Sequence, residues 1–371
     1  MQIKVLTSQN VQNSGERLLV QQATLNQEFV ITFDELDADQ RKRLNDLSQQ
    51  FYVNTTETDT GLIGVFDGSA LSQFIEALAD QPAFDSLQKI QSEHAITWQA
   101  GRYTYDLTHS GLVYAILNTT PDSFYDGGQY FNMDDVMAHV SAMIEQGADI
   151  IEVGGQSTRP GYTEISSQAE IDRIMPFIKA IQQTFPDIAI AVDTYKPDVM
   201  RAVIDAGVDI INDINGFTDD SAKLTLMHDS KVGMVSMLNR RLMDEPISYA
   251  NIIDTFTSQI NAFKDAGIDL KRVSLDPGVG FSTVGNLNND LGLMHGIKQL
   301  NQFHLPVMAA VSNKSYLQKL LGLAKDDRVT MTLITEALLY TDGNRILRVH
   351  NVEETAQMRQ LLDSITASYL A

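Results

Sequence analysis

The sequence predicts an α/β protein in which a closed (β/α)8 barrel (TIM barrel) follows a small α+β domain. From residue 113 onward, short apolar runs alternate with amphipathic segments of helix length, a pattern typical of βα units that build a parallel sheet. Eight such runs can be counted, which is the number that closes a barrel. An open doubly wound sheet is the alternative, but the first run is not followed by the glycine fingerprint of a dinucleotide-binding fold.

The expected barrel strands are short and rich in Val, Ile, Leu and Met. In chain order they read VYAIL (113–117), DIIEV (149–153), IAIAV (188–192), DIIN (209–212), VGMVSM (232–237), RVSL (272–275), PVMAAV (306–311) and RILRV (345–349). Helical segments such as 133–148 and 196–208 lie between them and end in glycine or other small residues, which favour helix termination.

The first hundred residues have a different pattern, which predicts a separate α+β domain over residues 1–95, with the barrel domain at 96–371. Strands are expected near 3–6, 29–33 and 62–66, and helices over 37–51, 69–80 and 84–95. The segment ITWQAGRYTYDL (96–107) alternates like a hairpin with Ala100-Gly101 as its turn, and we expect it to cover the N-terminal mouth of the barrel. This domain has neither a glycine-rich loop nor a His/Asp cluster, so its sequence indicates no role.

The composition argues against several classes of function. The formal net charge is −21, and no basic stripe offsets it, which disfavours a nucleic-acid surface. There is no run of roughly 18 apolar residues to cross a bilayer, and the first residues do not resemble a signal peptide. The chain has no cysteine for a disulfide or a thiolate metal site. We therefore expect a cytoplasmic protein without nucleic-acid or membrane partners.

Polar residues follow seven of the eight expected strands. In a (β/α)8 barrel the carboxyl ends of the strands build the active site, so these residues should converge. One such residue alone is most simply a helix cap or turn former, but convergence at one face favours a site. The residues are Asn118, then Ser157, Thr158 and Arg159 after Gly154-Gly155, Asp193, Asn212 and Asp213, Asp276, Ser312 to Lys314, and Arg348 with His350, whereas the fifth run leads into Met237-Leu238-Asn239.

The chemistry of these residues divides the expected site into two ends. Asp193, Asn212 and Asp276 are rich in acceptors and suit the amino and ring N–H donors of a flat heterocycle. The donors Arg159, Arg348 and His350 suit phosphate or carboxylate oxygens. Asn118 offers a neutral oxygen of the kind that Mg²⁺ accepts when phosphates supply the other ligands. The loops 120–128 and 154–161 have the composition of lids, or alternatively of simple solvated loops.

Six ordered motifs resemble those of dihydropteroate synthases. They are ILNTTPDSFYDGG, DIIEVGGQSTRPG, VDTYKPDVMRAVIDAGVDIINDI, LDPGVGF, SNKSYL and LRVHNV, and the resemblance covers residues 97 to 371. It implies a homodimeric barrel that joins p-aminobenzoate to 6-hydroxymethyl-7,8-dihydropterin diphosphate in folate synthesis, with release of diphosphate.

The resemblance also implies roles for individual residues. Asp193, Asp276 and Lys314 would be catalytic residues that hold the pterin together with Asn212. Arg348, His350 and Asn118 with Mg²⁺ would hold the diphosphate. The aminobenzoate side would be formed by Thr158, Arg159, Pro160 and Ser315, with Phe281 beside the ring.

Several residues depart from the family pattern. Asn313 stands where Arg is common, Ser282-Thr283 where Gly-Lys is common, Leu238-Asn239 where His-Met is usual, and Gln156 where Glu is usual. Two alternatives therefore remain beside the synthase. One is a barrel that binds pterin without catalysis, or with another second substrate, and acts as a folate-pathway partner. The other is a pterin-binding methyltransferase barrel, which needs neither the STRPG loop nor the Arg-x-His pair.

Overall fold

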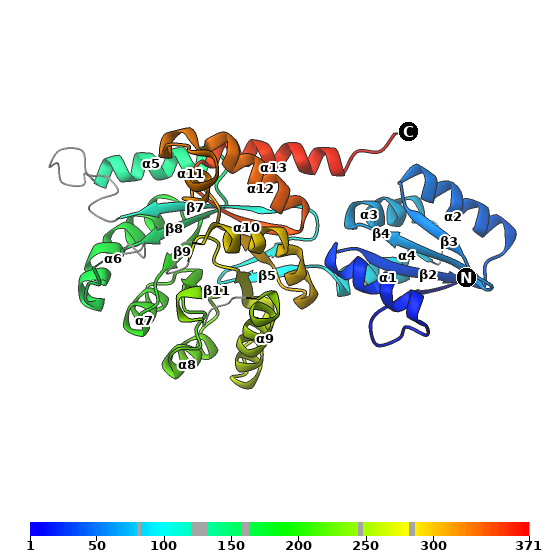
Figure 1. Ribbon diagram of the computed structural model, residues 1–371, viewed down its shortest axis with the longest axis horizontal. Helices are drawn as coiled ribbons and strands as arrows, with labels where there is room; N and C mark the ends of the chain where they lie inside the picture. Colours follow the sequence, from blue (N-terminus) through cyan, green and yellow to red (C-terminus); the bar gives the residue numbers. More distant parts are fainter. Residues whose placement is uncertain (80–82, 120–132, 157–162, 244–247, 282–285, 371) are drawn as a thin grey trace.

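The computed structural model describes residues 1–79, 83–119, 133–156, 163–243, 248–281 and 286–370. A closed barrel of eight strands lies beside a smaller domain built from the N-terminal part of the chain (Figure 1). The helices of the C-terminal part surround the barrel (Figure 1). The predicted (β/α)8 barrel is therefore confirmed, and the open doubly wound sheet is excluded because β9 pairs with β10 to close the ring in the order β10-β11-β12-β13-β14-β7-β8-β9.

All eight predicted runs form barrel strands, and neighbouring strands are parallel. The strands are β7 (Leu112–Asn118), β8 (Ile150–Gly154), β9 (Ala189–Asp193), β10 (Ile210–Asp213), β11 (Gly233–Met237), β12 (Val273–Asp276), β13 (Val307–Ala309) and β14 (Asn344–Val349). The surrounding helices are α5 (Met133–Glu145), α6 (Ser167–Thr184), α7 (Pro197–Asp205), α8 (Ser221–Asp229), α9 (Tyr249–Asp265), α10 (Leu287–His295), α11 (Tyr316–Leu321), α12 (Val329–Thr341) and α13 (Val352–Thr366). Short 3-10 helices lie at η2 (Arg240–Leu242), η3 (Leu270–Arg272), η4 (Ile297–Phe303) and η5 (Lys325–Asp327).

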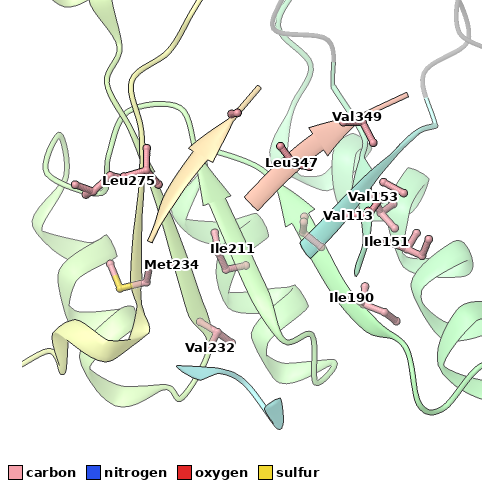
Figure 2. Packing of buried hydrophobic residues seen from close by; sticks show 14 of the residues in the cluster. Val113, Ile151, Val153, Ile190, Ile211, Val232, Met234, Leu275, Leu347 and Val349 are labelled. Atoms are coloured by element: carbon pink, nitrogen blue, oxygen red, sulfur yellow. The ribbon is translucent and has the colours of Figure 1, made fainter. Parts of the chain in front are cut away.

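The pleat of the strands sorts their side chains into an outer and an inner set, because successive residues point to opposite faces. Outer residues such as Val113, Ile151 and Leu347 pack with helix residues in the main hydrophobic core (Figure 2). Inner residues such as Tyr114 and Ile346 form a second apolar cluster in the N-terminal half of the barrel. Polar side chains on the inner face nearer the C-terminal strand ends therefore adjoin this apolar cluster.

A hairpin of β5 (Thr97–Ala100) and β6 (Tyr103–Asp106) packs against the N-terminal ends of barrel strands, as predicted. Trp98 is fully buried in the inner cluster and donates its indole N–H to the carbonyl of Arg272 at 3.0 Å. The predicted turn was wrong by one residue, because Ala100 pairs with Tyr103 and the turn is Gly101-Arg102. Gly101 has a φ of +60° and approaches Asp209 so closely that a Cβ would lie 2.6 Å from the Asp209 Cα, so glycine is required.

The smaller domain has a four-stranded antiparallel sheet with helices. Its strands, in the sheet order β1-β2-β4-β3, are β1 (Gln2–Val5), β2 (Phe29–Asp34), β4 (Gly61–Phe66) and β3 (Asn54–Glu57), and its helices are α1 (Ser14–Leu25), α2 (Ala38–Gln50), α3 (Gly68–Ala77) and α4 (Ala83–Glu93). The predicted boundary near residue 95 falls between α4 and β5. The sequence analysis missed α1 and β3.

Both missed elements bury few side chains, which explains why hydrophobic periodicity did not reveal them. Helix α1 buries Val20 and Ala23, and strand β3 is exposed along its whole length. A capping signal was nevertheless present, because the Asn13 side chain accepts from the backbone N–H of Glu16, and the Glu16 carboxylate accepts from the N–H of Gln12.

Polar contacts and the C-terminal segment attach the small domain to the barrel. Asn301 donates to the carbonyl of Leu25 at 2.7 Å, and Gln27 donates to Asn301 Oδ1 at 3.2 Å. Beyond α13, the Tyr369 ring packs edge-on against Phe51 of the small domain at 5.3 Å between centroids, and Figure 1 shows the chain end directed toward that domain. Within the described ranges, no helix is both long and apolar enough to cross a membrane.

Candidate active site

Six polar side chains form a layer inside the C-terminal half of the barrel. They share the pleat face of the inner apolar cluster, since five of them lie two or four residues beyond an apolar residue of that cluster, and Asp276 lies two residues beyond the buried Ser274. They are Asn118 of β7, Glu152 of β8, Asp193 of β9, Asn212 of β10, Asp276 of β12 and Arg348 of β14. Asp213 follows Asn212 but has the opposite orientation, and its carboxylate pairs with the buried Lys223 of α8 at 2.8 Å. Asp213 therefore supports the barrel wall.

Glu152 is the centre of this layer, and the sequence analysis did not select it. Only 1% of it is exposed. Its carboxylate accepts from Arg348 Nε at 2.9 Å and from Asn212 Nδ2 at 2.9 Å. A signal was available in the run DIIEV, because an acid in the middle of an apolar strand has to point either to a helix or into the barrel. Glu152 thus joins Arg348 and Asn212, which had been expected at opposite ends of the site.

Arg348 also contacts Asp193, with its Nη2 3.0 Å from the carboxylate. Burial, and then repulsion from Glu152, raise the pKa of Asp193 to about 7, although Arg348 acts in the opposite sense. Burial lowers the pKa of Arg348, but Glu152 and Asp193 raise it by more, so the guanidinium stays charged. Arg348, which the sequence had placed at the anion-binding end of the site, therefore contacts Asp193 of the acceptor-rich end.

Asn212 is oriented to receive a donor. It is 3% exposed, and its Nδ2 donates to Glu152. Its Oδ1 is buried and accepts no hydrogen bond within the part of the chain that the structure describes. A buried acceptor without a donor costs free energy, commonly about 1–3 kcal/mol, so its retention favours a ligand that donates to it.

Asp276 and Lys314 form the second polar group of the site. Burial raises the pKa of Asp276, while Lys314 opposes that rise. The Asp276 carboxylate also accepts from the backbone N–H of Gly278 at 2.8 Å. Burial lowers the pKa of Lys314 to about 8, and the nearby Asp276 limits the decrease. The Lys314 ammonium donates to the Val279 carbonyl, which links this cation to the loop after β12.

The remaining predicted site residues lie at the rim or outside the described ranges. Phe281 is partly exposed just after the β12 loop, and Ser315 is exposed directly before α11. His350 is exposed, and its backbone N–H donates to the Ser312 hydroxyl at 3.2 Å. Thr158, Arg159 and Pro160, together with Ser282-Thr283, fall outside the described residues.

Two departures from the family pattern have structural explanations. Asn313 has a φ of +53°, a conformation that Asn tolerates well, and its Nδ2 donates to Asn351 Oδ1 at 2.8 Å. Gln156 donates to the Tyr195 hydroxyl at 2.9 Å, while its oxygen accepts from Lys196 Nζ at 2.7 Å. A carboxylate at position 156 could not make the first of these bonds as a donor.

At positions 238 and 239 the departure brings different side chains into the loop after β11. Leu238 is buried in the main hydrophobic core. Asn239 donates to Asn215 Oδ1 at 2.7 Å and accepts from the backbone N–H of Arg241 at 3.1 Å. These contacts order the start of η2 and do not place a charge in the site.

Comparison with known proteins identifies the family. Residues 114–350 match the family model described as "Pterin binding enzyme". The dihydropteroate synthase of Clostridium beijerinckii is 36% identical over 266 residues, which are 71% of this chain and 98% of that protein. The chain belongs to the dihydropteroate synthase family.

Other members of the dihydropteroate synthase family give the same result. The Escherichia coli K12 synthase is 36% identical over 70% of this chain and 93% of its own length. A Clostridium difficile synthase structure, obtained in the presence of pteroic acid, has a TM-score of 0.66 at 32% identity and covers 73% of this chain and 100% of that one. A Xanthomonas albilineans synthase with 4-aminobenzoic acid has a TM-score of 0.67 at 31% identity, covering 74% and 99%. The family match begins at β7, so the small domain lies outside it.

Proposed function

We infer that this protein is a dihydropteroate synthase, a transferase that condenses 6-hydroxymethyl-7,8-dihydropterin diphosphate with p-aminobenzoate. The observation that carries the inference is the inner polar layer, in which Asn212 Oδ1 is buried with no donor among the described residues, on the same inner face as Asp193 and Asp276. Three acceptors in this water-poor layer suit a flat ring that is rich in N–H donors. The family match supports the same substrate class.

The inner polar layer also suits the charge changes of the reaction. The aromatic amine attacks the pterin methylene carbon, a C–N bond forms, and the C–O bond to diphosphate breaks with its electron pair on the departing oxygen. The amine loses one proton, which passes to water or to the departing diphosphate. Positive charge that develops on the methylene is stabilised by the carboxylates of Glu152 and Asp276, while Arg348 and Lys314 are cations that stabilise the developing anion. The reaction requires no nucleophilic side chain, so positioning supplies much of the catalysis.

The proposal places the diphosphate near Arg348, His350 and Asn118, with Mg²⁺. Among the described residues there is no cluster of three or more His, Asp or Glu side chains that could hold a metal by itself. Asn118 contributes one neutral oxygen on the inner face of β7. This donor set fits an ion that is held mainly by diphosphate oxygens and water. When bound, Mg²⁺ would neutralise part of the charge of the leaving group.

The second substrate is proposed to lie toward Phe281 and Ser315, and the same proposal assigns Thr158 and Arg159, which lie outside the described residues, to its binding. Phe281 and Ser315 support this position because both border the loops next to Lys314. Folate synthesis from these substrates in the cytoplasm is part of the same proposal, in agreement with the absence of cysteine from the sequence.

A homodimer is also proposed, and an apolar stripe on two adjacent helices supports it. Large side chains at a spacing of four residues are more than half exposed on both helices, which contact each other. They are Ile334 and Leu338 of α12, and Leu361 and Ile365 of α13. Such a stripe is self-complementary about a two-fold axis and suits a second copy of the chain.

The test is the Asp276→Ala substitution. We expect loss of measurable pterin diphosphate binding by calorimetry and of dihydropteroate formation, while circular dichroism shows an intact fold. Asp213→Asn is the matched control, because it alters a buried carboxylate of the barrel that faces outward, and it should lower the melting temperature without changing pterin affinity. Unchanged pterin binding in Asp276→Ala would contradict the proposed site. Pterin binding by the unmodified chain without product formation would instead favour a non-catalytic barrel.

A further inference from the structure

The loop after β12 contacts both members of the second polar group of the site. The Asp276 carboxylate accepts from the backbone N–H of Gly278 at 2.8 Å. The Val279 carbonyl accepts from the Lys314 ammonium. Gly280 packs closely on the same lysine, since a Cβ added there would lie 3.1 Å from the Lys314 Cδ. The path of this backbone therefore influences where the carboxylate and the ammonium lie.

A buried ion pair from two other segments holds this backbone. Arg240, the first residue of η2, is 2% exposed, and its Nη2 donates to the Gly278 carbonyl at 3.1 Å. The same guanidinium forms an ion pair with Asp290 of α10. The Asp290 carboxylate also accepts from the backbone N–H of Gly280 at 2.9 Å. The pair thus holds the loop on both sides of Val279, the residue that Lys314 contacts.

The loops after β11 and β12 also contact each other through their backbones. The N–H of Leu238 donates to the Asp276 carbonyl at 2.8 Å. Gly278 has a φ of +68°, and a Cβ added there would lie 2.4 Å from the Leu238 carbonyl oxygen. Only glycine allows this approach without strain. The two loops and the start of α10 therefore form one unit, and Arg240 contacts each part of it.

Stability alone does not explain a buried ion pair at this place. The removal of two charges from water costs free energy that their attraction often only balances, and an apolar pair of similar volume avoids this cost. The Arg240 Nη1 is also buried, and it has no hydrogen-bond partner within the ranges that the structure describes. The pair is therefore not optimised for stability, which favours a role in supporting the groups of the site.

The ion pair also acts on Lys314 through space. Burial is the largest influence and lowers the pKa of Lys314. Asp276 raises this pKa, whereas Arg348 lowers it. Asp290 raises the same pKa and Arg240 lowers it. Because the two members of the pair have opposite effects, removal of one charge should shift the titration of Lys314 in the direction opposite to removal of the other.

We propose that Arg240 and Asp290 are positioning residues that hold the loop after β12 in the geometry in which the site binds the pterin. This assignment rests on the proposed synthase function. Both residues lie outside the inner polar layer, so they act on the substrate through Asp276 and Lys314.

The experiment measures kcat/KM for pterin diphosphate against pH, at saturating p-aminobenzoate, in the unmodified chain and in two variants. Arg240→Gln should lower kcat/KM at neutral pH by about tenfold or more, because small misplacements of binding groups are costly in catalysis. Asp290→Asn should lower it less, since an amide oxygen can still accept from Gly280. The alkaline decline in kcat/KM should move to higher pH in Arg240→Gln and to lower pH in Asp290→Asn.

Two further variants separate geometry from charge and from folding. Arg240→Lys keeps the charge without the planar fork, so it should lower kcat/KM and leave the pH of the decline unchanged. The double substitution Arg240→Met with Asp290→Leu leaves no unpaired buried charge and should fold even where Arg240→Gln does not. It should lose kcat/KM as Arg240→Gln does, with little shift of the decline, because the two opposing charges disappear together.

Arg102→Gln is the matched control, because it breaks an ion pair of 3.0 Å with Asp209 at the N-terminal mouth. It should lower the melting temperature without changing kcat/KM or the pH of its decline. Unchanged kcat/KM in folded Arg240→Gln, or shifts in the same direction for both single variants, would overturn the assignment. Absence of product from the unmodified chain would overturn the proposed function. Calorimetry of pterin diphosphate binding would then decide the assignment, because Arg240→Gln should still weaken that binding.

Discussion

Both mouths of the barrel contain buried charged groups, but they use them differently. At the N-terminal mouth, Arg102 pairs with Asp209 at 3.0 Å and also donates to the carbonyls of Pro186 and Ile188. Asp209 further accepts from the backbone N–H of Ile190 at 3.0 Å. At this end every one of these charges has a partner of the opposite sign or a backbone group.

The C-terminal mouth is less well satisfied within the chain. Burial raises the pKa of Asp193 to about 7, and Asn212 Oδ1 has no donor among the described residues. Both features cost folding free energy, because the charged or polar form is withdrawn from water without full compensation. The difference teaches that one end of the barrel is optimised for stability, while the other keeps unsatisfied groups for ligands.

The largest effect that separates the two mouths is expected at Trp98. Trp98→Ala removes a fully buried ring and its hydrogen bond to Arg272, so we expect the free energy of unfolding to fall by about 3–5 kcal/mol. The KM values should not change, because the hairpin lies at the end remote from the site. Chemical denaturation and steady-state kinetics at a temperature where the variant is folded measure both. A rise in KM without a loss of stability would contradict this division of roles between the two mouths.

A smaller effect is expected from the pH dependence of Lys314. Its pKa of about 8 means that the ammonium loses its proton as the pH rises above this value. If the positive charge binds the anionic substrate, kcat/KM should fall by roughly tenfold per pH unit above pH 8. Lys314→Arg should move this decline to higher pH, since arginine stays charged. Retention of the same decline in Lys314→Arg would assign it to another group.

The smallest effect concerns stability at the C-terminal mouth. The pKa of Asp193 rises from 3.8 in the unfolded chain to about 7 in the folded protein. Ionisation of Asp193 therefore destabilises the fold progressively as the pH rises from 3.8 to about 7. Asp193→Asn removes this ionisation, so its melting temperature should exceed that of the unmodified chain by a few degrees at pH 8 and by less at pH 5. A variant that is less stable at pH 8 would show that the Arg348 pair outweighs the cost of burial.

The barrel was more predictable than the small domain for a physical reason. Its strands are buried on both faces and therefore appear as continuous apolar runs, and all eight were found. Helix α1 and strand β3 bury little, so their sequences carry little periodicity. The predicted hairpin turn differs from the observed one by one residue. The prediction makes Gly101 the second turn residue, whereas in the structure Gly101, with its positive φ, is the first.

The candidate site shows the same limit at the level of single residues. Asp193, Asn212 and Asp276 could be selected because they directly follow apolar runs. Glu152 lies within a run, so its role emerged only from its contacts with Arg348 and Asn212. The contact between Arg241 and the Phe281 ring could not be predicted either, because the two residues lie in different loops.

The sequence by itself determined the βα order, the location of polar residues at strand ends and the resemblance to dihydropteroate synthases, since these depend on local pattern and residue type. Tertiary structure decided which polar residues point inward and which acids share one arginine. These properties arise from pleat register and from contacts between residues as far apart as Glu152 and Arg348, 196 positions along the chain. Electrostatic effects depend on distance and burial in space, and neither quantity is encoded in sequence separation.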